Sequence, residues 1–293
     1  MTKSHSNSNF SGPGYITKVV HSLADGMQKV VTSRRHRKGR GAMLVFPEGI
    51  QPEPAAKHKN PWLHFWAPSR LTWWVAVLFA IGSALFSVGG YGITFPDNSP
   101  EVLTTGINLD WIFFIGSIFF TSAAACQLLE SINAGSSEGL YAEEKLSDTF
   151  QWAAWHPNRI GYMASLVQLI GTVMFNFNTG NAFISDLNWI QQDILIWTPN
   201  FIGCICFLIA SRLAFMEICH GYWGWQPGNI EWWITVLNLL GSIGFMISAL
   251  YSLAVPPGDS SATFSWLSAF FTFQGGVCFF IASYLLLPEM FSE

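Results

Sequence analysis

Three glutamates stand at matching positions near the ends of apolar segments, and they are the first candidates for chemistry in this sequence. Each follows a repeated glycine by fourteen residues; the three are Glu130, Glu217 and Glu289. Glu217 also precedes His220 by three residues, the helical spacing of carboxylate and histidine ligands in metal-binding bundles. One such pair does not make a metal site, so Glu217 and His220 stay the only metal candidates and no cofactor is expected.

Two arginines offer the simplest partners for these carboxylates. Arg70 and Arg159 each stand just before an apolar segment, twelve residues ahead of a glycine, and the third such position holds no base. In an antiparallel hairpin, the start of the first helix and the end of the second lie at the same membrane face. We therefore predict interfacial ion pairs, Arg70 with Glu130 and Arg159 with Glu217. Glu289 has no equivalent partner.

Few strongly polar side chains stand within the apolar segments, and three of them could line a path through a helix bundle. Gln168 and Asn238 occupy equivalent positions, three residues before a repeated glycine, and Arg212 is the one base inside an apolar segment. Buried amides often bond between helices, and a guanidinium stays protonated and is costly to bury. Two interpretations are open: a polar path along Gln168, Asn238 and Arg212, or structural bonding in which Arg212 reaches the interface or pairs with a glutamate.

Composition and motifs disfavour several functional classes. The net charge of −4 creates no field that would attract a nucleic acid, so no such partner is expected. The sequence contains no glycine-rich phosphate loop, no HExxH and no GxSxG. An enzyme is therefore not favoured.

Six long apolar segments must position the polar residues. They span about residues 71–92, 111–132, 160–180, 199–218, 232–255 and 266–287. Each can cross the roughly 30 Å hydrocarbon core as a helix of about 20 residues, and none alternates with the period of a barrel strand. The predicted fold class is all-α: a polytopic membrane protein, residues 70–293, whose six transmembrane helices form three tandem helical hairpins.

The distribution of basic residues predicts the orientation of these helices. Eleven of the 14 Lys and Arg lie at or before Arg70, whereas the loops at 93–110, 181–198 and 256–265 contain acids and no base. The positive-inside rule then places both termini in the cytoplasm. We expect a multi-pass protein of the cell membrane.

The six segments also carry an internal repeat, with units at about 70–132, 159–218 and 229–289. In every segment a glycine is followed, four residues later, by a phenylalanine. These glycines are Gly82, Gly171 and Gly241 in the odd segments and Gly116, Gly203 and Gly275 in the even segments. Small residues let helices approach closely, so we predict a packing role for all six.

The hairpins begin with aromatic-rich stretches such as RLTWW (70–74) and IEWW (230–233) and continue with a Gly-Ser-x-x-Phe pattern. In these features the sequence resembles the YrhK-like bacterial integral membrane proteins. The resemblance covers residues 70–289 as three units. It implies a two-helix unit without an assigned function, and no catalytic residues.

Residues 1–69 differ from the rest and predict a basic cytoplasmic region. Apolar residues between 15 and 31 recur at the spacing of one helix face, which predicts an amphipathic helix, and the proline-containing stretch 41–69 predicts a linker. A basic run lies between them and consists of Arg34, Arg35, Arg37, Lys38 and Arg40. It either binds an anionic lipid surface or only sets the topology by its charge.

Three functional hypotheses follow. The favoured one is a non-enzymatic structural or interaction protein in the lipid bilayer, with an unknown oligomeric state. The alternative is a small transporter or channel with a polar path near Gln168, Asn238 and Arg212. A metal-dependent membrane enzyme is the third. A cavity that reaches the bilayer midplane would favour transport, whereas a closed, dry bundle would favour the structural role.

Overall fold

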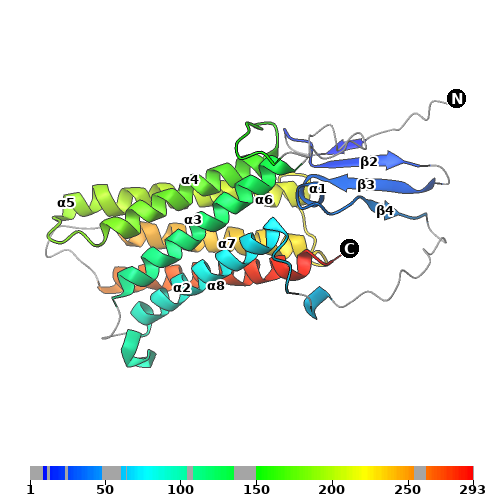
Figure 1. Cartoon of the computed structure of the whole chain (residues 1–293). Helices are drawn as coiled ribbons and strands as arrows, with labels where there is room; N and C mark the ends of the chain where they lie inside the picture. The colour runs from blue at the N-terminus through cyan, green and yellow to red at the C-terminus, as the bar shows by residue number, and fades with distance from the viewer. Residues whose placement is uncertain are drawn as a thin grey trace.

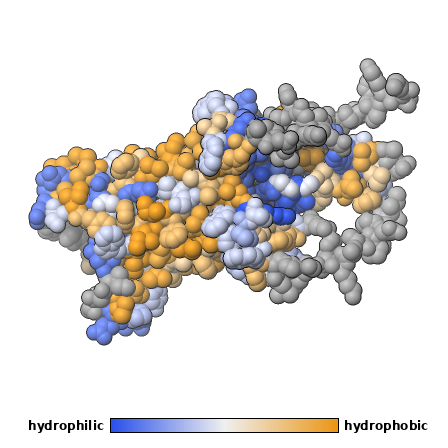
Figure 2. Space-filling model, in the orientation of Figure 1, coloured by the Kyte–Doolittle hydropathy of each residue, from blue (hydrophilic) through white to orange (hydrophobic). Residues whose placement is uncertain are grey.

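The computed structural model describes residues 9–11, 14–23, 26–47, 61–63, 65–103, 108–134, 150–253 and 262–292. These residues form a bundle of long helices with a small antiparallel sheet beside one end (Figure 1). On the face that Figure 2 shows, apolar residues cover the length of the bundle and hydrophilic residues gather toward its two ends.

Six of the described helices are long and apolar enough to cross a membrane. They are α2 (Leu71–Thr94), α3 (Leu109–Asn133), α4 (Ile160–Asn181), α6 (Thr198–Cys219), α7 (Ile230–Tyr251) and α8 (Ala262–Glu289). The chain is therefore a multi-pass membrane protein, and the predicted helical fold class is confirmed.

The six helices pack side by side into a closed ring. Neighbours in sequence pack together as the pairs α2–α3, α4–α6 and α7–α8, and α3 also packs on α4 and α6 on α7. α8 packs along α2, which closes the ring. We call the end beside the sheet, where α2 starts and α8 stops, the basal end, and the opposite end the distal end.

The fourth membrane passage starts earlier than the sequence predicts. α5 (Trp189–Gln192), the π-helical turn η6 (Asp193–Trp197) and α6 form one passage of 31 residues. A π turn shifts carbonyls out of the α-helical hydrogen-bonding pattern. Two asparagines of α4 compensate, because Asn178 donates to the Ile196 carbonyl (3.0 Å) and Asn181 to the Leu195 carbonyl (2.7 Å).

The repeated glycines lie where the two helices of each hairpin come closest. A Cβ atom added at Gly82 would lie 2.9 Å from the carbonyl oxygen of Gly116. The corresponding distance is 3.1 Å both between Gly171 and Gly203 and between Gly241 and Gly275. Because the obstacle is backbone in each case, a side chain at these positions would push the two helices apart.

The first part of the chain folds as a sheet, and the predicted amphipathic helix over 15–31 is wrong. Strands β1 (Asn9–Ser11), β2 (Lys18–Ser22), β3 (Gln28–Thr32) and β4 (Met43–Val45) pair antiparallel in sequence order. Val19 stands opposite Val31 and Val20 opposite Val30. β-branched residues favour strands, and Gly26 in the connection has a φ of 74°, which no helix contains. The helix-like spacing therefore comes from two short valine-rich strands.

The predicted linker over 41–69 also contains regular structure. β4 lies within it, and so does the 3-10 turn η2 (Pro61–Leu63), while residues 48–60 lie outside the described part of the chain. Between β3 and β4 the chain forms a short helix, α1 (Ser33–Arg37), which carries the basic run to the basal end of the bundle.

The close approach of α4 and α6 makes a stability prediction. A Cβ atom at Gly203 would lie 2.7 Å from the Phe175 ring and 3.0 Å from the Gly171 carbonyl oxygen. We expect Gly203→Ala to lower the free energy of unfolding by about 1–3 kcal/mol, although alanine is the better helix former. Gly228→Ala is the control, because nothing lies within 4 Å of its added Cβ. Thermal unfolding in detergent measures both, and equal midpoints would contradict the packing argument.

Candidate functional site

The basal end of the bundle contains four buried carboxylates. Three of them, which we call the terminal glutamates, lie in the last turns of α3, α6 and α8: Glu130, Glu217 and Glu289. The fourth, Glu231, lies in the first turn of α7. Glu289 is 0% exposed and Glu217 is 2% exposed. A buried carboxylate is costly unless it is paired, so this end of the bundle requires cations.

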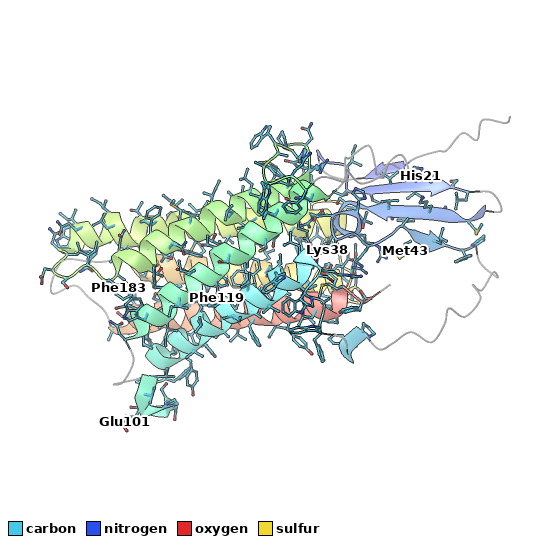
Figure 3. The ribbon with its side chains drawn as sticks, in the orientation of Figure 1. His21, Lys38, Met43, Glu101, Phe119 and Phe183 are labelled. Atoms are coloured by element: carbon cyan, nitrogen blue, oxygen red, sulfur yellow. The ribbon has the colours of Figure 1, made fainter. Side chains whose placement is uncertain are left out.

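The helix α1 supplies these cations. Arg34, Arg37 and Lys38 have the i, i+3, i+4 spacing that places side chains on one face of a helix. Lys38 lies at the junction between α1 and the bundle (Figure 3). The ion pairs join Arg34 Nε to Glu289 Oε1 (2.8 Å), Lys38 Nζ to Glu289 Oε2 (2.5 Å), Arg37 Nη2 to Glu217 Oε2 (2.9 Å) and Arg40 Nη1 to Glu231 Oε1 (2.7 Å).

The start of α1 sets the direction of its side chains. The Thr32 hydroxyl accepts the backbone N–H of Arg35 as the N-cap, and Ser33 Oγ donates to Glu217 Oε1 at 2.8 Å. Arg35 is directed elsewhere, with Nε donating to the Gly41 carbonyl at 3.3 Å. Carboxylates of the bundle therefore pair with Arg34, Arg37, Lys38 and Arg40 of the basic run. Binding of this run to anionic lipids stays a prediction.

Charge balance makes the burial of this cluster tolerable, since four bases face four carboxylates. Burial lowers the pKa of Lys38 to about 8, and the neighbouring Arg34 charge adds to this effect while Glu289 opposes it. Burial alone would also lower the pKa of Arg34, but Glu289 raises it above the ordinary arginine value. A second bond, from Arg34 Nη2 to Glu289 Oε2 at 3.0 Å, makes this pair bidentate and hence the strongest of the cluster.

The predicted ion pairs of Arg70 and Arg159 are wrong. Arg70 Nη1 donates to the Met290 carbonyl (3.0 Å), and Arg159 Nη1 donates to the Ala134 carbonyl (2.9 Å). Both carbonyls follow the last turn of a membrane helix, where orphaned acceptors and the negative end of the helix dipole attract cations. Glu130 instead accepts a hydrogen bond from the Thr72 hydroxyl. Glu289, for which the sequence offers no base equivalent to Arg70 or Arg159, contacts three cations of the basic run.

A small chamber of about 60 Å³ lies inside the bundle next to the basic run. Gln168 and Asn238 both line it, together with Gln127, whose Nε2 donates to Gln168 Oε1 at 2.9 Å. Arg212 is not among the lining residues, and its guanidinium lies over the Phe215 ring at 5.7 Å. The structure thus brings two of the three predicted path residues together and separates the third from them.

Six phenylalanines that follow the repeated glycines fill the centre of the bundle in two layers. The basal layer consists of Phe120, Phe207 and Phe279, whose ring centroids are mutually 5.6–6.2 Å apart. The distal layer consists of Phe86, Phe175 and Phe245, and each of its rings packs on the basal ring of its own hairpin at 5.0–5.2 Å. Two rings of the basal layer line the chamber.

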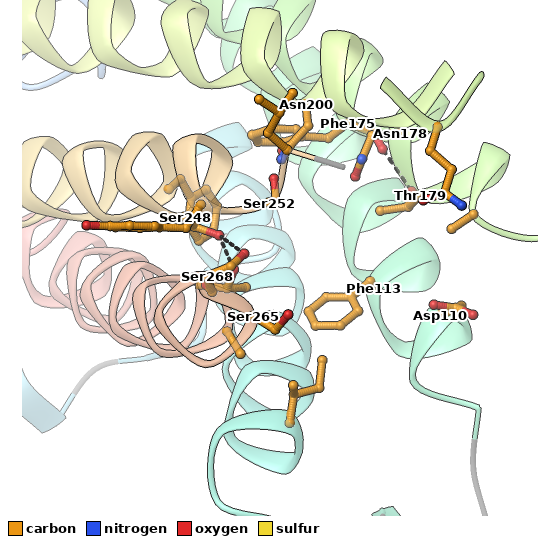
Figure 4. A pocket seen from close by; sticks show the side chains of 18 of the residues that line it. Asp110, Phe113, Phe175, Asn178, Thr179, Asn200, Ser248, Ser252, Ser265 and Ser268 are labelled. Carbon is orange, nitrogen blue, oxygen red and sulfur yellow. Dashed lines mark hydrogen bonds between the residues drawn. The ribbon is translucent and has the colours of Figure 1, made fainter. Parts of the chain in front are cut away.

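A larger cavity of about 810 Å³, which we call the vestibule, lies on the distal side of these layers (Figure 4). All six membrane passages contribute to its wall, and all three rings of the distal layer line it. The wall is rich in hydroxyls and amides; Ser248, for example, is hydrogen-bonded to Thr272 at 2.7 Å and to Ser268 at 3.2 Å. Asp110 is the one charged side chain among its described lining residues.

The metal candidates Glu217 and His220 have other contacts. The Glu217 carboxylate binds Arg37 and Ser33, and His220 Nδ1 lies 3.0 Å from Thr17 Oγ1, next to the sheet. Among the described residues, no three His, Cys, Asp or Glu side chains are grouped as metal ligands. Burial lowers the pKa of His220 to about 4, aided by the charge of Lys18.

One repeated motif is visible in the sequence but was not among the predicted features. A Trp-x-Pro sequence precedes each odd membrane passage, at residues 66–68, 155–157 and 225–227. The motif tryptophan stacks edge-on against the aromatic residue seven positions later: Trp66 on Trp73 (5.0 Å), Trp155 on Tyr162 (6.0 Å) and Trp225 on Trp232 (5.1 Å). This contact defines how each hairpin begins at the basal interface, where amphipathic aromatic rings are favoured.

Comparisons of this chain with protein-family models, with curated proteins and with solved structures found no match.

The buried cluster predicts a large effect for its central arginine. Arg34→Gln leaves Glu289 with less compensating charge, so we expect the free energy of unfolding to fall by about 3–5 kcal/mol. Arg35→Gln, one residue away in the same helix, should change it by about 0.5 kcal/mol or less. Denaturation in detergent, followed by tryptophan fluorescence, compares the two. Equal losses would show that the pair with Glu289 is unimportant for stability.

The pKa of His220 predicts a pH dependence. The folded pKa of about 4 lies below the ordinary histidine pKa of 6.5, so the unfolded chain takes up the proton first as the pH falls. This contribution to stability is complete above pH 6.5 and is lost progressively between pH 6.5 and 4. We expect the thermal midpoint to fall more between pH 7.5 and 5 in the wild type than in His220→Gln. Parallel pH profiles would contradict the prediction.

Proposed function

We propose that this membrane protein is a gated pathway for small solutes and that the structure is its closed state. One observation carries the proposal: the vestibule and the chamber are each walled by all six membrane passages, and two layers of phenylalanine separate them. Two cavities that share a ring of helices lie along the axis of that ring.

The phenylalanine layers have the properties of a gate. A hydrophobic constriction stops ions and water because neither can leave its hydrogen-bonding partners to cross it. Phe120, at 0% exposure, contacts both other rings of the basal layer, so movement of this one side chain would open the layer.

The vestibule supports transport over a purely structural role. A bundle that only needs stability gains by filling its interior, because each unfilled volume loses packing contacts. Here about 810 Å³ is left open against a wall of hydroxyls and amides. A cavity that reaches the centre of the bundle is the feature that distinguishes the two hypotheses.

We also propose an orientation of the protein in the membrane, its cellular location and an internal repeat. We infer that the basal end is cytoplasmic, because 11 of the 14 basic residues lie at or before Arg70 and the distal loops carry none. The cell membrane is then the location. Three repeated hairpins would supply one phenylalanine each to either layer, and the YrhK-like resemblance would describe one such hairpin.

Thiol accessibility tests the pathway. In a variant whose five cysteines are replaced by alanine, Ser248→Cys places a thiol in the vestibule and Ser283→Cys places one in the chamber. A membrane-impermeant methanethiosulfonate added from the distal side should modify the first at least about tenfold faster. Adding Phe120→Ala, or the milder Phe120→Leu, should bring the chamber thiol to a similar rate.

The control is Ile118→Cys, on the outer surface of α3, where Ile118 is 44% exposed. A thiol surrounded by lipid does not ionise and should stay unmodified in every background. If the vestibule thiol is as inert as this control, or if opening the phenylalanine layer leaves the chamber thiol inert, the proposed pathway does not exist.

A further inference from the structure

We propose that the pathway conducts cations and that the segment Ser33–Arg40 is a tethered cationic blocker of its basal mouth. This inference rests on the proposed pathway, and it names the substrate class and the regulation of that pathway.

The charges along the pathway have one sign when α1 is set aside. Among the described residues that line the two cavities, the membrane passages contribute Asp110 in the vestibule and Glu130 in the chamber, and no Lys or Arg. The basal mouth adds the buried carboxylates of Glu217 and Glu289. Rings of carboxylates admit cations and repel anions. Arg212, the one base within a membrane helix, lies outside both linings.

The segment occupies the place that a permeating cation would need. Arg34, Arg37 and Lys38 form the basal side of the chamber wall. Their guanidinium and ammonium groups lie 2.5–2.9 Å from carboxylate oxygens of Glu217 and Glu289. Each terminal carboxylate so occupied is unavailable to a second cation, so the segment and a permeating cation compete for the same oxygens.

The attachment of the segment allows withdrawal. Ser33, Arg34 and Arg37 of α1 bond to the membrane passages through their side chains, as does Lys38 just beyond the helix. The backbone of α1 continues into β3 and β4, so the sheet holds the segment on both sides. A cleft of about 550 Å³ beside Arg34, Arg35 and Arg40 separates part of the sheet from the bundle and leaves room on the outer side.

Flux through reconstituted protein tests the blocker. Proteoliposomes contain Phe120→Ala, which opens the basal phenylalanine layer, combined with Arg37→Gln, Arg37→Lys or Arg35→Gln. Arg37 is chosen because its side chain is the least buried of the paired bases, at 10% exposure. We expect Arg37→Gln to raise potassium flux at least about tenfold over Arg35→Gln, and Arg37→Lys to stay within about threefold of it, with chloride flux unchanged.

A second set guards against misfolding of the gate variant. The same three substitutions, made with Phe120 intact and with Phe120→Leu, should keep the same order of potassium flux, and size-exclusion profiles verify the fold of each. Potassium flux that is equal in Arg37→Gln and Arg35→Gln across all folded sets would overturn the blocker. Chloride flux that rises together with potassium flux would overturn the cation selectivity.

The experiments distinguish a failure of the blocker from a failure of the pathway. A chamber thiol that the Phe120 variants expose, with no effect of Arg37→Gln on flux, leaves the pathway intact and removes the blocker. A chamber thiol that no Phe120 variant exposes removes the pathway, and the blocker with it.

Discussion

Neutralising the carboxylates buried at the basal end is the constraint on which the rest of this structure depends. Glu289 has no exposed surface and Glu217 almost none, so water cannot stabilise either charge. The compensating cations come from a segment more than 170 residues away in sequence, which must arrive at a defined depth and angle. The strands that flank α1 meet this requirement, because a paired sheet holds both ends of a short helix that could not persist alone. The sheet of the N-terminal region therefore positions the cations that the bundle requires.

The same glycines that bring each hairpin together also place the phenylalanine rings. A Cβ atom at Gly116 would meet the Phe86 ring at 2.9 Å, and one at Gly203 would meet the Phe175 ring at 2.7 Å. Each ring thus lies in space that the partner helix leaves open by having no side chain. Close helix approach and the placement of the aromatic rings are consequently coupled in each of the pairs α2–α3, α4–α6 and α7–α8. A larger residue at one of these glycines would disturb both the spacing of the hairpin and the position of a gate ring.

Hydrophobic runs predicted the six membrane helices well, because lipid imposes the same length and polarity on every crossing helix. They also indicated Gln168 and Asn238, which line the chamber. The N-terminal region was predicted poorly, since valines such as Val19 and Val31 satisfy a helix spacing and a strand pairing equally well. Arg70 and Arg159 were assigned to glutamates because both kinds of residue were predicted at the same membrane face. That prediction left out the carbonyls at the helix ends, which compete for the same guanidinium groups. The pairing of the basic run with the terminal glutamates is a long-range contact that no local sequence pattern encodes. However, the sequence placed the basic run and the glutamates at the same membrane face, and their opposite charges could have indicated the pairing.

The two barriers of the proposed pathway complement each other physically. A layer of phenylalanine blocks ions of either sign and provides no selectivity. A ring of carboxylates distinguishes cations from anions but attracts the ions that it selects, so by itself it is no barrier. The basic segment converts this attractive site into a closed one by filling it with the chain's own cations. The chamber between the barriers measures about 60 Å³, far less than the 810 Å³ of the vestibule. Because Phe207 and Phe279 form one side of this chamber and Arg34 and Lys38 the other, withdrawal of the segment would hydrate the basal phenylalanine layer directly. Release of the blocker and opening of the gate are therefore coupled, because both the basic segment and the basal phenylalanine layer line the same small chamber.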